Sequence, residues 1–173
     1  MGSLRPGRSY HHPKKKAYTR LSVHRPRKSY VKGVPAPKIH QFEMGKKGDY
    51  PLTFNLVSRE IVQIRSNSLE SARITTLKCL TKKLGENNFF LKILIYPHNV
   101  LRENAMATGA GADRFSQGMR KSFGKPIGLA ARVKVGQKII TVNSEKNSEA
   151  GVRMALKRAT YKLPGKFYIK MVK

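Results

Sequence analysis

The chain has 173 residues, which is enough for one compact domain with appendages. Its 36 lysines and arginines against 9 acidic residues give a formal net charge of +27 at pH 7. An isolated domain with this excess would repel itself, so we expect a polyanion as its normal partner. Because each cation placed on a phosphate releases condensed counterions, the composition favours a nucleic acid over a merely solvated basic surface.

Cysteine and histidine usage excludes several kinds of site. Cys79 is the single cysteine, which excludes a disulfide within the chain and a cysteine-based zinc site. Four of the five histidines lie in a strongly basic segment, where neighbouring cations would repel a metal ion. No apolar run approaches the ~20 residues that span a bilayer, and no signal-peptide pattern follows the N-terminus. We expect an intracellular protein with no membrane partner, cofactor or metal.

Residues 1–48 have the composition of an extended basic arm. Proline recurs and no apolar periodicity persists, so we expect the arm to become ordered on binding RNA. Three tyrosines alternate with the cations; they could stack on bases, or they could pack on the protein's own domain. The candidate rRNA-binding residues of the arm are Arg5, Arg8, Tyr10, Lys16, Tyr18, Arg20, Arg25, Arg27, Lys28, Tyr30, Lys32 and Lys38.

Residues 49–173 have the pattern of one folded α+β domain, with two helices packed on a mixed or antiparallel sheet. Residues 52–56 and 61–64 predict one or two short strands, and 89–95 predicts a central strand. Further strands are expected at 129–135 and 138–142, which form a hairpin at Gly136, and at 167–172. Asn67 and Glu70 predict the start of one helix, which Gly85 ends. Asn147 or Ser148 begins the other, which Pro164-Gly165 stops.

The second helix also offers candidate RNA contacts. Its apolar face is expected to comprise Val152, Ala155, Leu156, Ala159 and Leu163. Arg153 and Lys157 lie four residues apart on another face, and almost no acid interrupts the charge that follows. A charged helix face is usually only solvated, but here we favour contact with RNA.

A glycine-rich segment at 96–126 is the candidate functional loop, because structureless loops of this length are uncommon in compact domains. Its glycines let backbone amides approach phosphates closely, and its side chains are basic or amide-bearing. An irrelevant surface insertion is the alternative. The candidate residues of this loop are Arg102, Asn104, Gly109, Gly111, Arg114, Gln117, Arg120, Lys121 and Lys125.

The sequence contains no motif that predicts an enzyme. The pair Gly109 and Gly111 lacks the third glycine of a dinucleotide fingerprint, since position 114 is arginine. Gly124-Lys125 is followed by Pro126 where a P-loop needs a hydroxyl group, so nucleotide hydrolysis is not indicated. Asp113 fits an Asx turn or an ion pair better than catalysis. A DNA-binding protein would need a recognition helix, and an RNA-modifying enzyme a cofactor motif or nucleophile; we find neither.

Several stretches together resemble a known family. They are Arg5-Pro6-x-Arg8-x-Tyr10, SYVKGVPAPKIHQFEMG at 29–45, SLESARI at 68–74, GAGADRFSQGMRKSFGKPIG at 109–128, ARVKVGQ at 131–137 and ALKRATYKLPG at 155–165. This combination resembles the universal large-subunit ribosomal protein sixteen family, in its archaeal and eukaryotic branch, called ten-e in archaea. The resemblance covers nearly the whole chain, departs from the family at residues 11–13 and 25–28, and favours the archaeal form.

The resemblance implies a structural constituent of the large ribosomal subunit in the cytoplasm, with a hammerhead-like α+β sandwich. It implies partners in large-subunit rRNA near the peptidyl-transferase centre, in tRNA and in neighbouring ribosomal proteins, without a homo-oligomer. The arm would thread between rRNA helices. The loop at 96–126 would point toward the tRNA acceptor end and help to position tRNA in the aminoacyl-site corridor without taking part in chemistry.

Overall fold

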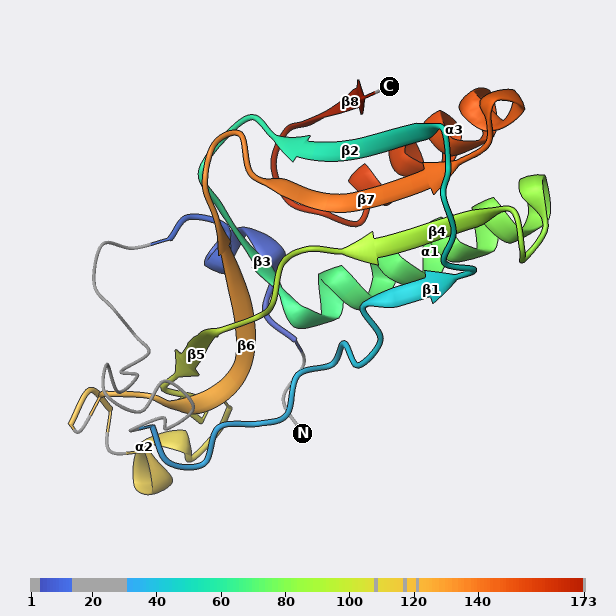
Figure 1. The fold of residues 1–173 in the computed structure, drawn as a ribbon. Coiled ribbons are helices and arrows are strands. Elements are labelled where there is room, and N and C mark those ends of the chain that lie inside the picture. Colours follow the sequence, from blue (N-terminus) through green and yellow to red (C-terminus); the bar gives the residue numbers. More distant parts are fainter. Residues whose placement is uncertain (1–3, 14–30, 108, 117, 121, 173) are drawn as a thin grey trace.

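The computed structural model describes residues 4–13, 31–107, 109–116, 118–120 and 122–172 (Figure 1). Within them, strands form two antiparallel sheets. The strands are β1 (Glu43–Gly45), β2 (Leu52–Ser58), β3 (Val62–Arg65), β4 (Phe89–Ile93), β5 (Asn99–Glu103), β6 (Lys125–Val133), β7 (Lys138–Ser144) and β8 (Phe167–Val172). The helices are α1 (Ser66–Leu84), α2 (Ala112–Phe115) and α3 (Glu149–Thr160), with 3-10 turns η1 (Gly7–Tyr10) and η2 (Lys146–Ser148).

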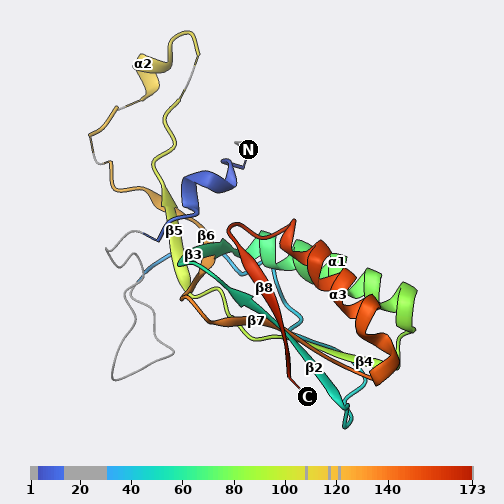
Figure 2. The same cartoon turned by 90° about the horizontal axis from the view of Figure 1, so that it is seen from above.

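The larger sheet carries the core. Its strand order is β1-β4-β7-β2-β8, and α1 and α3 lie side by side on one of its faces (Figure 2). Side chains of alternate strand positions meet the apolar faces of the helices, and Phe54, Leu56, Ile140, Leu69 and Leu156 are at most 1% exposed. The predicted α+β class, with two helices on an antiparallel sheet, is confirmed.

The smaller sheet has the order β3-β6-β5. Its strand pairing shows that the predicted hairpin at Gly136 is wrong. The chain does turn at Gly136, but β6 and β7 are not a hairpin, because β6 pairs with β3 and β5 while β7 pairs with β2 and β4. The turn is tied instead to the end of β2. The amide of Gly136 donates to the Ser58 carbonyl at 2.9 Å, and the Ser58 amide donates to the Gln137 carbonyl at 3.1 Å.

The two predicted helices are present, with one boundary moved. Helix α1 begins at Ser66 after Arg65, so the prediction that Asn67 caps it is wrong. Its predicted end is confirmed, because Gly85 takes a φ of 83°, which favours glycine. Helix α3 follows Ser148 as predicted. All of its predicted apolar residues, Val152, Ala155, Leu156, Ala159 and Leu163, are buried.

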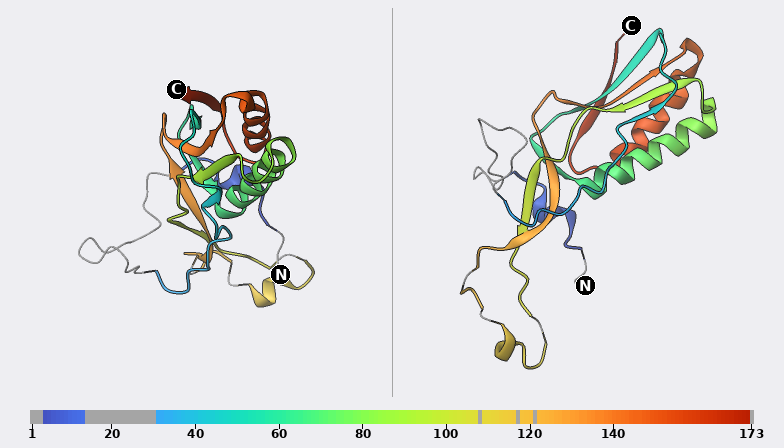
Figure 3. Two further views of the ribbon diagram at one scale, coloured as in Figure 1. Left: turned by 45° about the vertical axis from the view of Figure 1, so that its right-hand side comes forward. Right: turned by 60° about the horizontal axis from the view of Figure 1, so that its bottom comes forward.

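The predicted loop at 96–126 is partly regular. Residues 99–103 form β5, residues 112–115 form α2, and β6 begins at Lys125, so the prediction of an irregular segment is wrong there. Strands β5 and β6 pair as a ribbon with a bulge between Leu101 and Arg102. The described residues between 104 and 124 extend from the end of this ribbon away from the five-stranded sheet (Figure 3).

The first 48 residues are also not irregular throughout. Strand β1 pairs with β4 at the edge of the larger sheet, and Ile39, at 1% exposure, belongs to the hydrophobic core. Turn η1 contacts β3 of the smaller sheet. Among the described residues, no helix has the length and apolar character needed to cross a membrane.

Candidate nucleic-acid interface

The N-terminal segment, residues 4–13, is held against the smaller sheet by side chains and backbone of β3. The Gln63 amide donates to the His11 carbonyl at 2.8 Å, and its side-chain Nε2 donates to the Tyr10 carbonyl at 3.0 Å. Arg65 Nη1 donates to the Arg5 carbonyl at 2.8 Å. Because these bonds satisfy backbone acceptors, they hold the segment whatever its side chains do.

Two of the predicted arm residues are engaged within the protein. Arg5 Nε lies 2.6 Å from Glu103 Oε1, and this hydrogen bond and charge raise the pKa of Arg5. The half-buried ring of Tyr10 lies 5.7 Å from the Arg65 guanidinium. Burial, together with the nearby charge of Glu103, raises the pKa of the Tyr10 hydroxyl. Packing on the protein's own domain is therefore what Tyr10 does in this structure.

The remaining arm predictions divide into exposed and undescribed residues. Arg8, Lys32 and Lys38 are exposed to solvent, where phosphate contact is open to them. Seven candidates lie outside the described residues: Lys16, Tyr18, Arg20, Arg25, Arg27, Lys28 and Tyr30.

The base of the loop, which we call the neck, is a close junction between β5 and β6. Arg102 stacks 4.5 Å from the centroid of the Phe123 ring, and its Nη1 donates to the Gly124 carbonyl at 2.9 Å. Gly124 lies so near the opposite strand that a Cβ there would come within 2.4 Å of the Glu103 carbonyl carbon. Only glycine fits this approach, so the neck holds both ends of the loop together.

The loop beyond the neck presents cations and backbone amides. Gly109 and Gly111 take φ values of 126° and 73°, which lets the chain reverse into α2. The predicted residues Asn104, Arg114, Arg120 and Lys125 are exposed, while Gln117 and Lys121 lie outside the described residues. The loop also exposes Met106, Met119 and Phe123, at 51%, 70% and 77%. Exposed apolar groups among cations suit a partner that offers both phosphates and flat bases.

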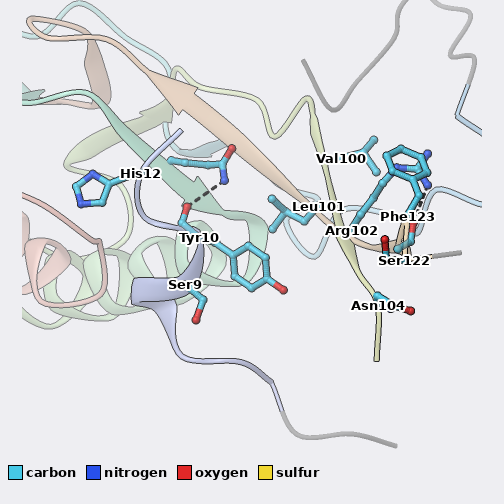
Figure 4. Close-up of a pocket in the computed structure, with 11 residues that line it drawn as sticks. Ser9, Tyr10, His12, Val100, Leu101, Arg102, Asn104, Ser122 and Phe123 are labelled. Atoms are coloured by element: carbon cyan, nitrogen blue, oxygen red, sulfur yellow. Dashed lines mark hydrogen bonds between the residues drawn. The ribbon is translucent and has the colours of Figure 1, made fainter. Parts of the chain in front are cut away.

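A hollow lies between η1 and the neck (Figure 4). Tyr10 and His12 come from the N-terminal side, Leu101 and Arg102 from β5, and Phe123 from the far side of the loop. Its lining includes a cation and hydroxyl groups but no carboxylate. In the part of the chain that the structure describes, no group of three His, Cys, Asp or Glu side chains is placed to hold a metal ion.

The two predicted RNA contacts on helix α3, Arg153 and Lys157, have different surroundings. Arg153 Nε is paired with Glu149 Oε1 at 2.7 Å, one turn earlier, and its guanidinium lies 5.9 Å from the Phe54 ring. Lys157 is exposed. Further exposed cations on the two helices were not predicted as contacts: Lys78, Lys82, Lys83 and Arg158.

Two residues that organise the interface were missed from the sequence. Arg65 fixes the N-terminal segment and Glu103 pairs with Arg5 across 98 positions of sequence. Neither lies in a recognisable motif, so no local signal identifies them. Phe123 did have a signal, since it is an aromatic residue among cations in the functional loop.

Some of the acidic residues are paired with the protein's own cations. In the part of the chain that the structure describes, Glu43, Glu70, Glu103 and Glu149 form ion pairs. Hydrogen bonds from Lys47 and Lys92 lower the pKa of Glu43 to about 2. Because its 36 lysines and arginines greatly outnumber its 9 acids, the protein presents a positive field at its surface, which attracts a polyanion.

Comparison with known proteins shows the family to which the chain belongs. Residues 13–170 match the family model described as ribosomal protein L16p/L10e. The chain belongs to this family. It is 47% identical over 165 residues to large ribosomal subunit protein uL16 of Methanococcus aeolicus, covering 95% of this chain and 91% of the relative. It is 48% identical over 172 residues to the uL16 of Saccharolobus solfataricus (98% and 93%), and 49% over 162 residues to that of Staphylothermus marinus (93% and 89%).

Membership in the L16p/L10e family confirms the resemblance seen in the sequence, including its archaeal branch. The chain is a ribosomal protein and not an enzyme. The residues described above are therefore candidates for binding and not for catalysis.

Proposed function

We propose that this protein is a structural constituent of the large ribosomal subunit in the cytoplasm. It binds large-subunit rRNA near the peptidyl-transferase centre, and its loop helps to position tRNA in the aminoacyl-site corridor. Neighbouring ribosomal proteins are its other partners, and it acts as one copy. The relatives named large ribosomal subunit protein uL16 support the first part, as does the charge of +27.

The neck is the observation that carries the positioning role. A group that places another molecule needs a fixed base, because small displacements at the base become larger ones at the tip. The loop is fixed by the stack of Arg102 on Phe123 and by the tight fit of Gly124 against Glu103. The Arg5–Glu103 ion pair adds a connection to the N-terminal segment. Arg114 and Arg120 are exposed, and the part of the chain between β5 and β6 that carries them extends away from the five-stranded sheet (Figure 3).

The chemistry of the loop fits placement of tRNA, since guanidinium groups and glycine amides are donors for phosphates and base edges. The described loop side chains offer no pair of nucleophile and base or of acid and base. The loop is accordingly assigned a binding role alone.

Sedimentation of a tagged chain from cell lysate through sucrose gradients, at moderate and high salt, tests the proposal. We expect the protein to remain with large subunits and whole ribosomes at both salt concentrations, because a protein that is an integral component of the subunit makes many buried contacts. A loosely bound polycation would move to the top of the gradient at high salt, since its affinity comes from counterion release. That second result would contradict the proposed function.

A further inference from the structure

The five-stranded sheet has two unequal faces. Helices α1 and α3 cover one, and none of the described helices lies over the other, which faces the viewer in Figure 1 and lies away from the helices in Figure 2. The antiparallel register sets residues of the helix-free face in rows that cross all five strands. One row, from β1 to β8, consists of Glu43, Lys92, Thr141, Asn55 and Lys170. The next consists of Gly45, Phe90, Asn143, Thr53 and Val172.

The first row is polar from edge to edge. Lys92 Nζ lies 2.7 Å from Glu43 Oε1, and Thr141 Oγ1 donates to Asn55 Oδ1 at 2.7 Å. Asn55 is only 2% exposed, so its amide is part of the floor of the face, while Lys170 is exposed. A sheet face that packs on another protein domain would be expected to be mainly apolar along such a row. The partner that suits this row is polar and charged.

Two aromatic residues interrupt the polar surface, each beside a cation. The half-buried Phe90 ring has Lys47 Nζ 5.9 Å from its centroid, and the half-buried Tyr168 ring has the Arg59 guanidinium at 5.5 Å. A ring next to a cation can stack on an unpaired base while the cation contacts the adjacent phosphate.

Cations outnumber acids on this face. The five strands, all of which the structure describes, contain Lys92, Lys138 and Lys170 and one acid, Glu43. Their flanks add the cations Lys47 and Arg59 and the acids Glu60 and Glu145. Both Lys47 and Lys92 lie within 2.7 Å of the Glu43 carboxylate, so the charge of Glu43 offsets the charge of these two neighbouring lysines. A purely solvated sheet face would have no need of this imbalance.

We infer that the helix-free face of the five-stranded sheet is a second RNA-binding surface, which takes a backbone with unpaired bases stacked on Phe90 or Tyr168. The inference rests on the proposed function in one respect, namely that the RNA is large-subunit rRNA. Its residues are not among the candidate RNA contacts of the arm or the loop, although Glu43, Gly45 and Lys47 fall within residues 1–48.

The single cysteine makes a proximity experiment practical. Cys79 is 5% exposed and is first removed by Cys79→Ala. Val172 is 43% exposed and belongs to a row of the helix-free face, so Val172→Cys in that background accepts an iron–EDTA tether. Lys78→Cys on α1 provides the matched tether on the opposite side. Each tethered chain is incorporated into large subunits, and rRNA cleavage by hydroxyl radicals is mapped.

We expect cleavage of rRNA strands by the tether at residue 172, at positions different from those cut from residue 78. Incorporation without rRNA cleavage from residue 172 would overturn the inference and leave the proposed function standing. Failure of the unmodified chain to enter large subunits would instead overturn the proposed function, and this inference with it.

A charge variant tests contact as distinct from proximity. Lys138→Gln with Lys170→Gln removes two exposed cations of the face, and Lys78→Gln with Lys82→Gln removes two from α1. We would measure rebinding to large subunits stripped of this protein as a function of salt. The slope of log K against log salt should fall in magnitude by about 1.4–1.8 in the sheet variant, given roughly 0.7–0.9 per phosphate contact. No fall, or the same fall in both variants, would overturn the inference.

Discussion

Arg5 and Glu103, separated by 98 positions in the sequence, are joined by an ion pair of 2.6 Å that links the N-terminal segment to the neck of the loop. Turn η1 reaches the smaller sheet on one side of this pair, and β5 runs into the loop on the other. The segment and the loop are thus mechanically connected, although the sequence presents them as separate units.

Replacing Glu103 with glutamine should loosen this connection without unfolding the protein. Exposed ion pairs contribute little to stability, so we expect the unfolding midpoint to change only slightly. The amide of Ser9, which donates to the Pro6 carbonyl at 3.1 Å, should exchange its hydrogen faster in the variant. Hydrogen exchange measured by mass spectrometry would check this, and unchanged exchange across residues 4–13 would show that the backbone bonds to β3 suffice.

Substitution of Gly124 by alanine should open the neck. The added methyl group would come 2.4 Å from the Glu103 carbonyl carbon, so one strand must move and the bond from Arg102 to the Gly124 carbonyl is lost. We expect destabilisation of about 1–3 kcal/mol, as for other overpacked sites. Chemical denaturation would measure it. Gly128→Ala, four residues further on in β6, is the matched control, because nothing lies within 4 Å of its Cβ position; equal destabilisation of the two variants would refute the explanation.

Acid should remove a specific contribution of Glu43. Hydrogen bonds from Lys47 and Lys92 lower the pKa of this carboxyl from 4.5 to about 2, so its ionised form favours the folded state. The contribution is complete above pH 4.5 and is lost as the pH falls through about 2. The difference in denaturation midpoint between the wild type and Glu43→Gln should therefore shrink across this window. A second variant, Lys47→Gln with Lys92→Gln, should behave likewise, and a pH-independent difference would contradict the assignment.

The tip of the loop should affect tRNA more than assembly. Arg114→Ala with Arg120→Ala removes two exposed cations beyond the neck, so we expect normal incorporation into large subunits and weaker tRNA binding at the aminoacyl site. Filter binding of aminoacyl-tRNA to purified ribosomes would measure the second effect. Lys82→Ala with Lys83→Ala at the end of α1 removes the same charge elsewhere. Loss of incorporation with normal tRNA binding in the ribosomes that do form would make the loop an assembly element.

The sequence predicted those elements whose signal is local. Helix α3 has apolar residues at helical spacing and is followed by Pro164-Gly165, so its buried face could be named in advance. Strand β5 was missed because one of its buried residues is polar. Asn99 is 2% exposed and its side-chain amide donates to Gln63 Oε1 at 2.7 Å. A buried polar residue at this position interrupts the apolar pattern by which a strand is recognised in a sequence.

The division into two sheets could not be predicted for a related reason. The turn at Gly136 has the same local chemistry whether the next strand pairs with the last one or departs from it. What decides is Ser58, nearly eighty positions earlier, which bonds to the turn through both its amide and its carbonyl. The packing of Tyr10 on β3 has the same origin, since Gln63 and Arg65 are remote in sequence.

The strand order also has a consequence for synthesis of the chain. Strand β2 comprises residues 52–58, whereas its two neighbours in the sheet come much later in the sequence, β7 at 138–144 and β8 at 167–172. A nascent chain therefore carries the apolar side chains of β2 without their partners until β7 and β8 have been synthesised. We expect the core to close only after β8 has left the ribosome, so that a product truncated before β7 would be a polycation without a core.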